Sequence, residues 1–164
     1  MIGPFAVGKT SLVRRFVDSI FSDNYLTTIG VKISKKIVPL ADTQVQLMIW
    51  DIEGVDVFTE LKTSYLRGAS GVLLVLDGTR PKSFEMAEEL VSLLREHLPD
   101  APVIGLLNKS DLSVEWKLGD LEIAAVEALG VQTMMTSAKT GENVEQAFMA
   151  LVEKMDATAS VSAS

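Results

Sequence analysis

The sequence contains no cysteine, and this absence removes several kinds of chemistry from consideration. A chain without thiols has no disulfide framework, no cysteine nucleophile and no prenylation site, so we expect no membrane anchor in this chain. It also has no apolar run of membrane-spanning length and no signal peptide ahead of its first motif, which predicts a cytoplasmic location. Acidic residues outnumber basic ones, and the resulting net charge of −7 argues against nucleic acid as a partner.

The composition is otherwise that of an ordinary globular protein. Hydrophobic residues make up 48% of the 164 residues and charged residues 23%, which is enough for one substantial core. We expect one domain over residues 1–156, a flexible polar tail at 157–164, and a monomer. His97 is the only histidine, lies in no motif, and is given no catalytic role.

Periodic apolar residues predict alternating strands and helices. Helices are expected over 9–19, over 84–98 with Ser83 as the N-cap, and from Val144 onward. The strands are expected at 31–40, 43–50, 72–76, 103–107 and 131–136. The first two form an antiparallel hairpin because only two residues separate them, and the continuously apolar runs are typical of parallel strands covered on both faces. The fold class is therefore α/β, with a mostly parallel sheet and one antiparallel hairpin.

Residues 3–10 read Gly-Pro-Phe-Ala-Val-Gly-Lys-Thr and fit the phosphate-binding loop pattern G-x-x-x-x-G-K-[ST] without a mismatch. In such a loop the backbone N–H groups face a polyphosphate, Lys9 reaches its terminal phosphates, and the Thr10 hydroxyl ligates magnesium. The residues assigned to this part of the site are Gly3, Val7, Gly8, Lys9, Thr10 and Ser11. On its own the loop indicates only a nucleoside triphosphate.

A phosphate-binding loop normally follows a complete buried strand, yet only Met1 and Ile2 precede Gly3. That strand would be central, and its loss would leave unpaired backbone groups between its neighbours. We expect the first strand to be largely missing from this sequence. The alternative is that the protein closes the gap in another way.

Two later segments predict that the base is guanine. Residues 108–111 read Asn-Lys-Ser-Asp after a buried strand, and the Asp111 carboxylate can accept two hydrogen bonds from the N1–H and N2–H₂ edge of guanine. Asn108 can reach the major-groove edge of the base, and the Lys109 stem can lie along its face. Ser137, Ala138 and Lys139 offer a backbone N–H to the guanine O6. In isolation Asn-Lys-x-Asp is equally typical of a turn, but a phosphate-binding loop upstream makes the base-binding interpretation far stronger.

Three further residues predict a response to the γ-phosphate. Asp51 is placed to hold a magnesium-bound water, and the Gly54 N–H to bond the γ-phosphate. Thr28 offers a hydroxyl to magnesium, although by itself it is more typical of a threonine at the start of a strand. Contacts of this kind exist only while the γ-phosphate is present, so the segments around them can order with it.

These motifs together resemble those of the Ras-superfamily small GTPases, most similar to the Rab branch. The resemblance extends through residues 25–31, 64–69, 77–84 and 136–144, and it covers nearly everything from residue 3 to 155. It implies a three-layer P-loop fold with a six-stranded sheet and five helices, and it implies GTP or GDP with Mg²⁺ as ligands. It also implies switch segments around 22–31 and 54–67 that contact effector proteins, and activating and exchange proteins as further partners.

The resemblance also assigns two aromatic residues to the nucleotide. Phe21 lies seven positions before Thr28 and matches the aromatic residue that packs edge-on against guanine in the family; a core phenylalanine ending the first helix is the equal alternative. Tyr25 belongs to the segment that leads to Thr28 and is assigned to the same site.

Departures from the family pattern fall on the catalytic machinery. Val55 stands where the family usually has a water-orienting glutamine, and a valine side chain forms no hydrogen bond. Glu53 replaces the usual alanine; it either repels the γ-phosphate or orients the water in place of the glutamine. Phe5 replaces a small residue, and Ile33 replaces the phenylalanine common in Rab proteins.

The candidate catalytic residues are Lys9, Thr28, Gly54 and Glu53. We expect a GTP/GDP switch that hydrolyses GTP slowly without an activating protein. The alternative is a nucleotide-binding interaction module, a pseudo-GTPase, without useful turnover.

Overall fold

The computed structural model describes residues 1–24, 27–41, 43–54 and 63–162. The strands are β1 (Val31–Leu40), β2 (Thr43–Ile52), β3 (Val72–Asp77), β4 (Val103–Asn108) and β5 (Gln132–Thr136). The helices are α1 (Lys9–Asp18), α2 (Lys82–Glu85), α3 (Ala87–His97), α4 (Asp120–Ala128) and α5 (Val144–Ser162). Residues 55–62, in the second expected switch segment, lie outside the described residues.

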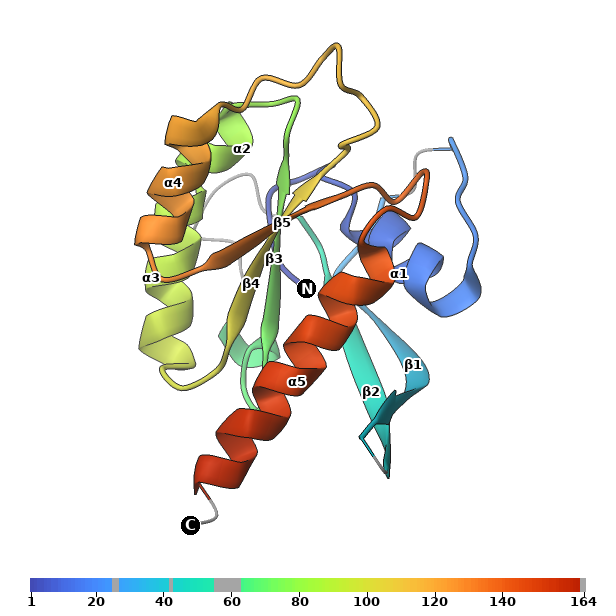
Figure 1. Cartoon of the computed structure of the whole chain (residues 1–164), viewed down its shortest axis with the longest axis vertical. Helices are drawn as coiled ribbons and strands as arrows, with labels where there is room; N and C mark the ends of the chain where they lie inside the picture. The colour runs from blue at the N-terminus through green and yellow to red at the C-terminus, as the bar shows by residue number, and fades with distance from the viewer. Residues whose placement is uncertain (25–26, 42, 55–62, 163–164) are drawn as a thin grey trace.

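The strands pair as the sequence predicts. β1 and β2 form an antiparallel hairpin in which Ile33 faces Trp50, and β3, β4 and β5 are parallel in that order. Helices cover both faces of the parallel sheet, with α3 and α4 on one side and α1 and α5 on the other (Figure 1). The predicted α/β fold class, a mostly parallel sheet with one antiparallel hairpin, is confirmed.

Alternate residues of β3 build two separate cores. Leu74 and Leu76 pack on the α3 side with Leu90 and Leu94, whereas Leu73 and Val75 pack on the other side with side chains of α1 and α5. All six residues of β3 are buried, because a strand covered by helices on both faces has no solvent-facing side. On the α1–α5 side Phe16 stacks on Phe148 with ring centroids 3.9 Å apart. This core holds α1 and α5 against the same face of β3.

Met1 and Ile2 occupy the place that the first strand would take. The Ile2 N–H donates to Leu73 O at 3.0 Å, Val75 N–H donates to Ile2 O at 2.9 Å, and Ile52 N–H donates to Met1 O at 3.3 Å. Ile2 thereby pairs in parallel with Leu74 and lies between β2 and β3. These two residues connect the hairpin to the parallel sheet and lead directly into the phosphate-binding loop.

The structure differs from the expectations about the helices at three points. Ser83 is not an N-cap but lies inside α2, where its Oγ accepts from the Asp77 N–H at 3.0 Å and donates to Arg80 O at 2.8 Å. The expected single helix is also broken at Met86, between α2 and α3. The predicted tail does not begin at Ala157, because α5 continues to Ser162. Alanine favours helix there. The Thr158 hydroxyl is accommodated within the helix by a bond to the carbonyl four residues earlier.

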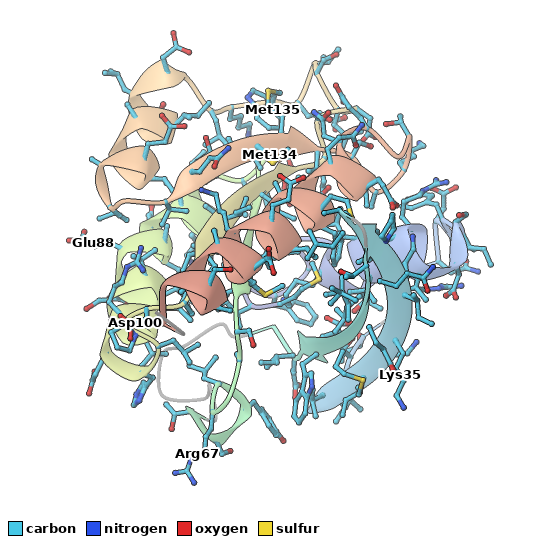
Figure 2. All side chains as sticks on the ribbon, turned by 60° about the horizontal axis from the view of Figure 1, so that its bottom comes forward. Lys35, Arg67, Glu88, Asp100, Met134 and Met135 are labelled. Carbon is cyan, nitrogen blue, oxygen red and sulfur yellow. The ribbon has the colours of Figure 1, made fainter. Side chains whose placement is uncertain are left out.

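Several charged side chains lie in solvent. Lys35 on β1 and Glu88 on α3 point away from the body of the molecule, as does Arg67 (Figure 2). Across the described residues no helix combines the length and the apolar character needed to cross a membrane.

Candidate nucleotide-binding site

The phosphate-binding loop runs from Gly3 to the first turn of α1 and curls around the ammonium group of Lys9. Lys9 Nζ donates to Gly3 O at 2.9 Å and to Pro4 O at 2.8 Å, and the side chain is buried. Gly8 has φ +100°, and a Cβ there would lie 2.3 Å from Asn108 Nδ2. The glycine is therefore required both by the backbone conformation and by the close approach of Asn108.

Gly54 lies against this loop, although it is far from it in sequence. A Cβ at Gly54 would lie 2.6 Å from Phe5 Cα and 2.9 Å from Lys9 Nζ. The end of β2 therefore brings the Gly54 main chain beside the ammonium group that the sequence assigns to the terminal phosphates. Only glycine permits so close an approach of two backbone segments.

Three oxygen-bearing side chains converge from α1, the first switch segment and β2. Thr10 Oγ1 donates to Asp51 Oδ2 at 2.6 Å, and it lies 2.6 Å from Thr28 Oγ1. Thr28 Oγ1 is also 3.4 Å from Asp51 Oδ2. Asp51 is fully buried, and among the described residues its Oδ1 has no hydrogen-bond partner.

These three residues fit the magnesium ion that the family implies. A buried carboxylate oxygen without a hydrogen-bond partner is available to a cation, and hydroxyl and carboxylate oxygens are the donors that Mg²⁺ prefers. The structure brings together all three residues that the sequence assigns to the metal. Asp51 lies one residue from the end of β2 rather than beyond a strand ending at 50, because β2 extends to Ile52.

At the other end of the site, Asn108 joins three segments. Its Nδ2 donates to Val7 O at 2.9 Å, and its Oδ1 accepts from the Ala138 N–H and the Thr136 hydroxyl, each at 3.3 Å. The sequence placed Asn108 at the edge of the base and did not foresee these contacts. They lock the phosphate-binding loop to the ends of β4 and β5.

Asp111 and Ser137 are neighbours. Ser137 Oγ donates to Asp111 Oδ1 at 2.6 Å and also accepts from the Thr140 N–H at 3.1 Å. Ser137 is buried, so it lies behind Asp111 and orients the carboxylate rather than facing the pocket. One oxygen of Asp111 is thus held by the protein.

Sequence reasoning missed an ionic cluster beneath Lys109. The Asp77 carboxylate is buried at the end of β3 and lies 2.7 Å from Lys109 Nζ and 2.8 Å from Arg80 Nε. Burial by itself raises the pKa of Asp77, but hydrogen bonds from Lys109 and Thr79 outweigh it, so the pKa lies below its ordinary value. Arg80 Nη2 donates in turn to Phe5 O at 2.7 Å, which links this cluster to the phosphate-binding loop.

One pocket of about 320 Å³ contains most of the predicted site. The predicted residues that line it are Gly8, Lys9, Thr10, Ser11, Phe21, Thr28, Gly54, Asn108, Lys109, Asp111, Ala138 and Lys139. Residues that sequence reasoning did not assign to the nucleotide also line it, namely Phe5, Ala6, Ser22, Asp23, Asn24, Thr27 and Leu112. Their only signal is position, since they lie in or next to the segments assigned from motifs.

Not every predicted residue lines this pocket. Gly3, Val7, Asp51 and Ser137 lie behind it, and the first two supply carbonyls that Lys9 and Asn108 bind. Tyr25 and Val55 lie outside the described residues. Phe21 lines the pocket and also packs against the core on the α1–α5 side, so it shows features of both interpretations.

Glu53 does not line the pocket either. Its Oε2 accepts a hydrogen bond from the Gly30 N–H at 2.7 Å, and its own N–H donates to Gly30 O at 2.8 Å. The carboxylate therefore contacts the first switch segment.

Comparison with known proteins places these features in one family. The Ras family model matches residues 1–157. The chain is 34% identical over 161 residues to the Ras-related protein SEC4 of Saccharomyces cerevisiae, covering 95% of this chain and 75% of that protein. It is 38% identical over 157 residues to the Ras-related protein Rab-10 of Diplobatis ommata, covering 93% and 78% respectively. The GTP-binding protein YPTM2 of Zea mays is 36% identical over 154 residues, covering 92% and 75%.

The match spans every segment that forms the pocket, and the family binds GTP and GDP with Mg²⁺, as the motifs predict. The chain belongs to the Ras family and is a Rab-like small GTPase.

Proposed function

We propose that this protein is a guanine-nucleotide switch that hydrolyses GTP slowly and regulates trafficking or signalling. The observation that carries the proposal is the convergence of Lys9, Thr28 and Gly54 on one end of the pocket. These are the groups suited to sensing a γ-phosphate, and they come from three segments that are distant in sequence. A cytoplasmic location and a monomeric state stay predictions.

Each part of the pocket has a role in this proposal. Lys9 and the backbone amides of residues 3–10 bind the phosphates, and Asp111 accepts from the guanine edge. Thr10, Thr28 and Asp51 would hold Mg²⁺. When bound, the ion neutralises charge on the phosphate oxygens.

The surroundings of the phosphates support slow turnover. The family's water-orienting glutamine is replaced by Val55, which forms no hydrogen bonds. Phe5 adds bulk at the pocket, and its main chain is held by Arg80 and lies against Gly54. That bulk obstructs the approach of an arginine supplied by an activating protein.

An exposed apolar surface offers a place for effectors. Ile33, Ile37, Met48 and Trp50 lie on the β1–β2 hairpin, and each is exposed by 40% or more. The hairpin joins the two switch segments, so its surface is continuous with the residues that sense the γ-phosphate. Exposed apolar side chains gathered on one element are typical of protein-binding surfaces. Because Ile33 replaces the Rab phenylalanine, we expect a set of effectors of its own.

Single-turnover hydrolysis tests the proposal. Protein loaded with GTP is mixed with Mg²⁺, and phosphate release is compared for wild type, Val55→Gln, and Val55→Gln combined with Phe5→Gly. We expect measurable but slow release from wild type and a rise of about tenfold or more in the variants, with the larger rise in the double variant, because the glutamine can then orient water.

Val114→Gln provides the matched control, since Val114 is exposed and lies outside the pocket lining. Complete absence of release in wild type and in both variants would favour the alternative, a nucleotide-binding module without turnover. Wild-type release as fast as that of a glutamine-bearing relative would contradict the proposed slow mechanism.

A further inference from the structure

Glu53 and Gly30 form a closely matched pair across the two switch segments. The Gly30 N–H donates to Glu53 Oε2 at 2.7 Å, and the Glu53 N–H donates to Gly30 O at 2.8 Å. The second bond is between main chains and survives any ordinary substitution at position 53. The first depends on the side chain, and the alanine usual at this position in the family cannot make it.

The pair lies between the groups that respond to the nucleotide. Gly30 is two residues after Thr28, and Glu53 directly precedes Gly54. Thr28 is itself held at 2.6 Å from Thr10 Oγ1 and 3.4 Å from Asp51 Oδ2. The segment around Thr28 is therefore held to the end of β2 at two points, by Asp51 and by the Glu53 carboxylate.

Each of these contacts joins two groups of the protein. A carboxylate accepting from a backbone N–H forms a charge-assisted hydrogen bond, which is stronger than a neutral one. The bond does not involve the γ-phosphate, so loss of that phosphate removes neither of its partners. Glu53 Oε2 is directed at Gly30, and Glu53 does not line the nucleotide pocket.

We propose that Glu53 is a positioning residue that holds the first switch segment on β2 and keeps Thr28 beside the magnesium site in the GDP form as well as the GTP form. This inference rests on the proposed switch function, because it concerns how far that segment is released when the γ-phosphate is lost. It replaces both roles foreseen for Glu53, repulsion of the γ-phosphate and orientation of water.

Amide hydrogen exchange of residues 27–33 tests the inference. The protein is loaded with GDP or with a non-hydrolysable GTP analogue, and chromatography of the bound nucleotide determines the loading. Glu53→Ala should speed exchange in the GDP form about 3- to 10-fold, the range expected for one partly exposed hydrogen bond. With the analogue the increase should be smaller, because the γ-phosphate then also holds Thr28.

Glu53→Gln separates the hydrogen bond from the charge. Its amide oxygen can still accept from the Gly30 N–H, so exchange should stay within about twofold of wild type. Glu89→Ala, an exposed glutamate on α3, controls for loss of a surface charge. A general loss of stability would raise exchange in both nucleotide forms and in β3 too, which this positioning role does not predict.

Unchanged exchange in Glu53→Ala, or an equal increase in Glu53→Ala and Glu53→Gln, would overturn the inference. Neither result depends on turnover. A wild-type protein that binds GTP without hydrolysing it would contradict the proposed function. The exchange comparison in the GDP form of that protein would still test the role of Glu53.

Discussion

Removal of the Asn108 side chain is the most informative perturbation of this site. Asn108→Ala deletes the donor to Val7 O at 2.9 Å and the acceptor shared by Ala138 and Thr136. Val7 and Ala138 are buried, so the groups that lose Asn108 as a partner have little access to bulk water. The substitution therefore separates the phosphate-binding loop from the base-binding segments while leaving every residue that faces the pocket from α1 in place.

The size of the effect follows from the groups left without partners. The Val7 carbonyl and the Ala138 N–H each lose a hydrogen bond in a buried setting, and an unsatisfied buried group costs about 1–3 kcal/mol. Some relaxation is expected, so we predict a loss of about 2–4 kcal/mol in the free energy of unfolding. For a domain of this size that corresponds to a decrease of about 4–16 °C in Tm.

Urea unfolding at two GDP concentrations measures this loss. Ligand binding adds a stabilisation that depends on concentration, so the two conditions separate intrinsic stability from nucleotide affinity. Gln132→Ala, which truncates an exposed amide side chain on β5, serves as the control and should change stability by less than about 0.5 kcal/mol. A similarly small change for Asn108→Ala would refute the view that Asn108 joins the two halves of the site.

Two further substitutions test the base-binding end of the pocket. Asp111→Ala should abolish the preference for GTP over ATP, measured by competition of each against a fluorescent guanine nucleotide; a retained preference would contradict the assignment of Asp111 to the guanine edge. Asp77→Asn should lower the free energy of unfolding at pH 7 by about 1–3 kcal/mol, because Lys109 and Arg80 lose a charged partner. Since the pKa of Asp77 is lowered by folding, its contribution is complete above the unfolded-state pKa and is lost as pH falls through the folded-state pKa, so the gap between wild type and variant should close in acid. A gap that persists at low pH would show that packing rather than charge is responsible.

Motifs with fixed spacing could be assigned from the sequence because their residues lie close together in the chain and bind the same ligand group through local backbone geometry. The phosphate-binding loop, Asp51 and the segment at 108–111 were recognisable for this reason, and the structure gathers them around one pocket. The hairpin and the buried strands could also be predicted, because alternating apolar residues and continuous apolar runs are plainly different patterns.

Contacts between segments that are distant in the sequence could not be predicted. The bond from Arg80 to Phe5 requires that the end of β3 lie beside the phosphate-binding loop, and no local pattern encodes that proximity. The role of Ser83 was misread for the same reason, because its hydroxyl bonds to the loop after β3 instead of starting a helix. The extent of α5 was underestimated because a short polar sequence has no periodic signal, although its helix propensity is adequate.

The position of the unusual residues explains how nucleotide binding and turnover can diverge in this protein. Lys9, Asp51 and Asn108 are buried, and each is bonded to backbone or side-chain groups that also hold the fold together, so their loss costs stability as well as binding. Phe5 and Glu53 instead lie at the edge of the site, where Phe5 is 37% exposed and the Glu53 side chain contacts only the first switch segment among the bonds described. Substitution of either side chain leaves the hydrogen bonds of Lys9, Asp51 and Asn108 in place. The departures at Phe5 and Glu53 are therefore compatible with intact nucleotide binding, and we predict that this protein differs from its Rab-like relatives more in the rate of hydrolysis than in the affinity for GTP.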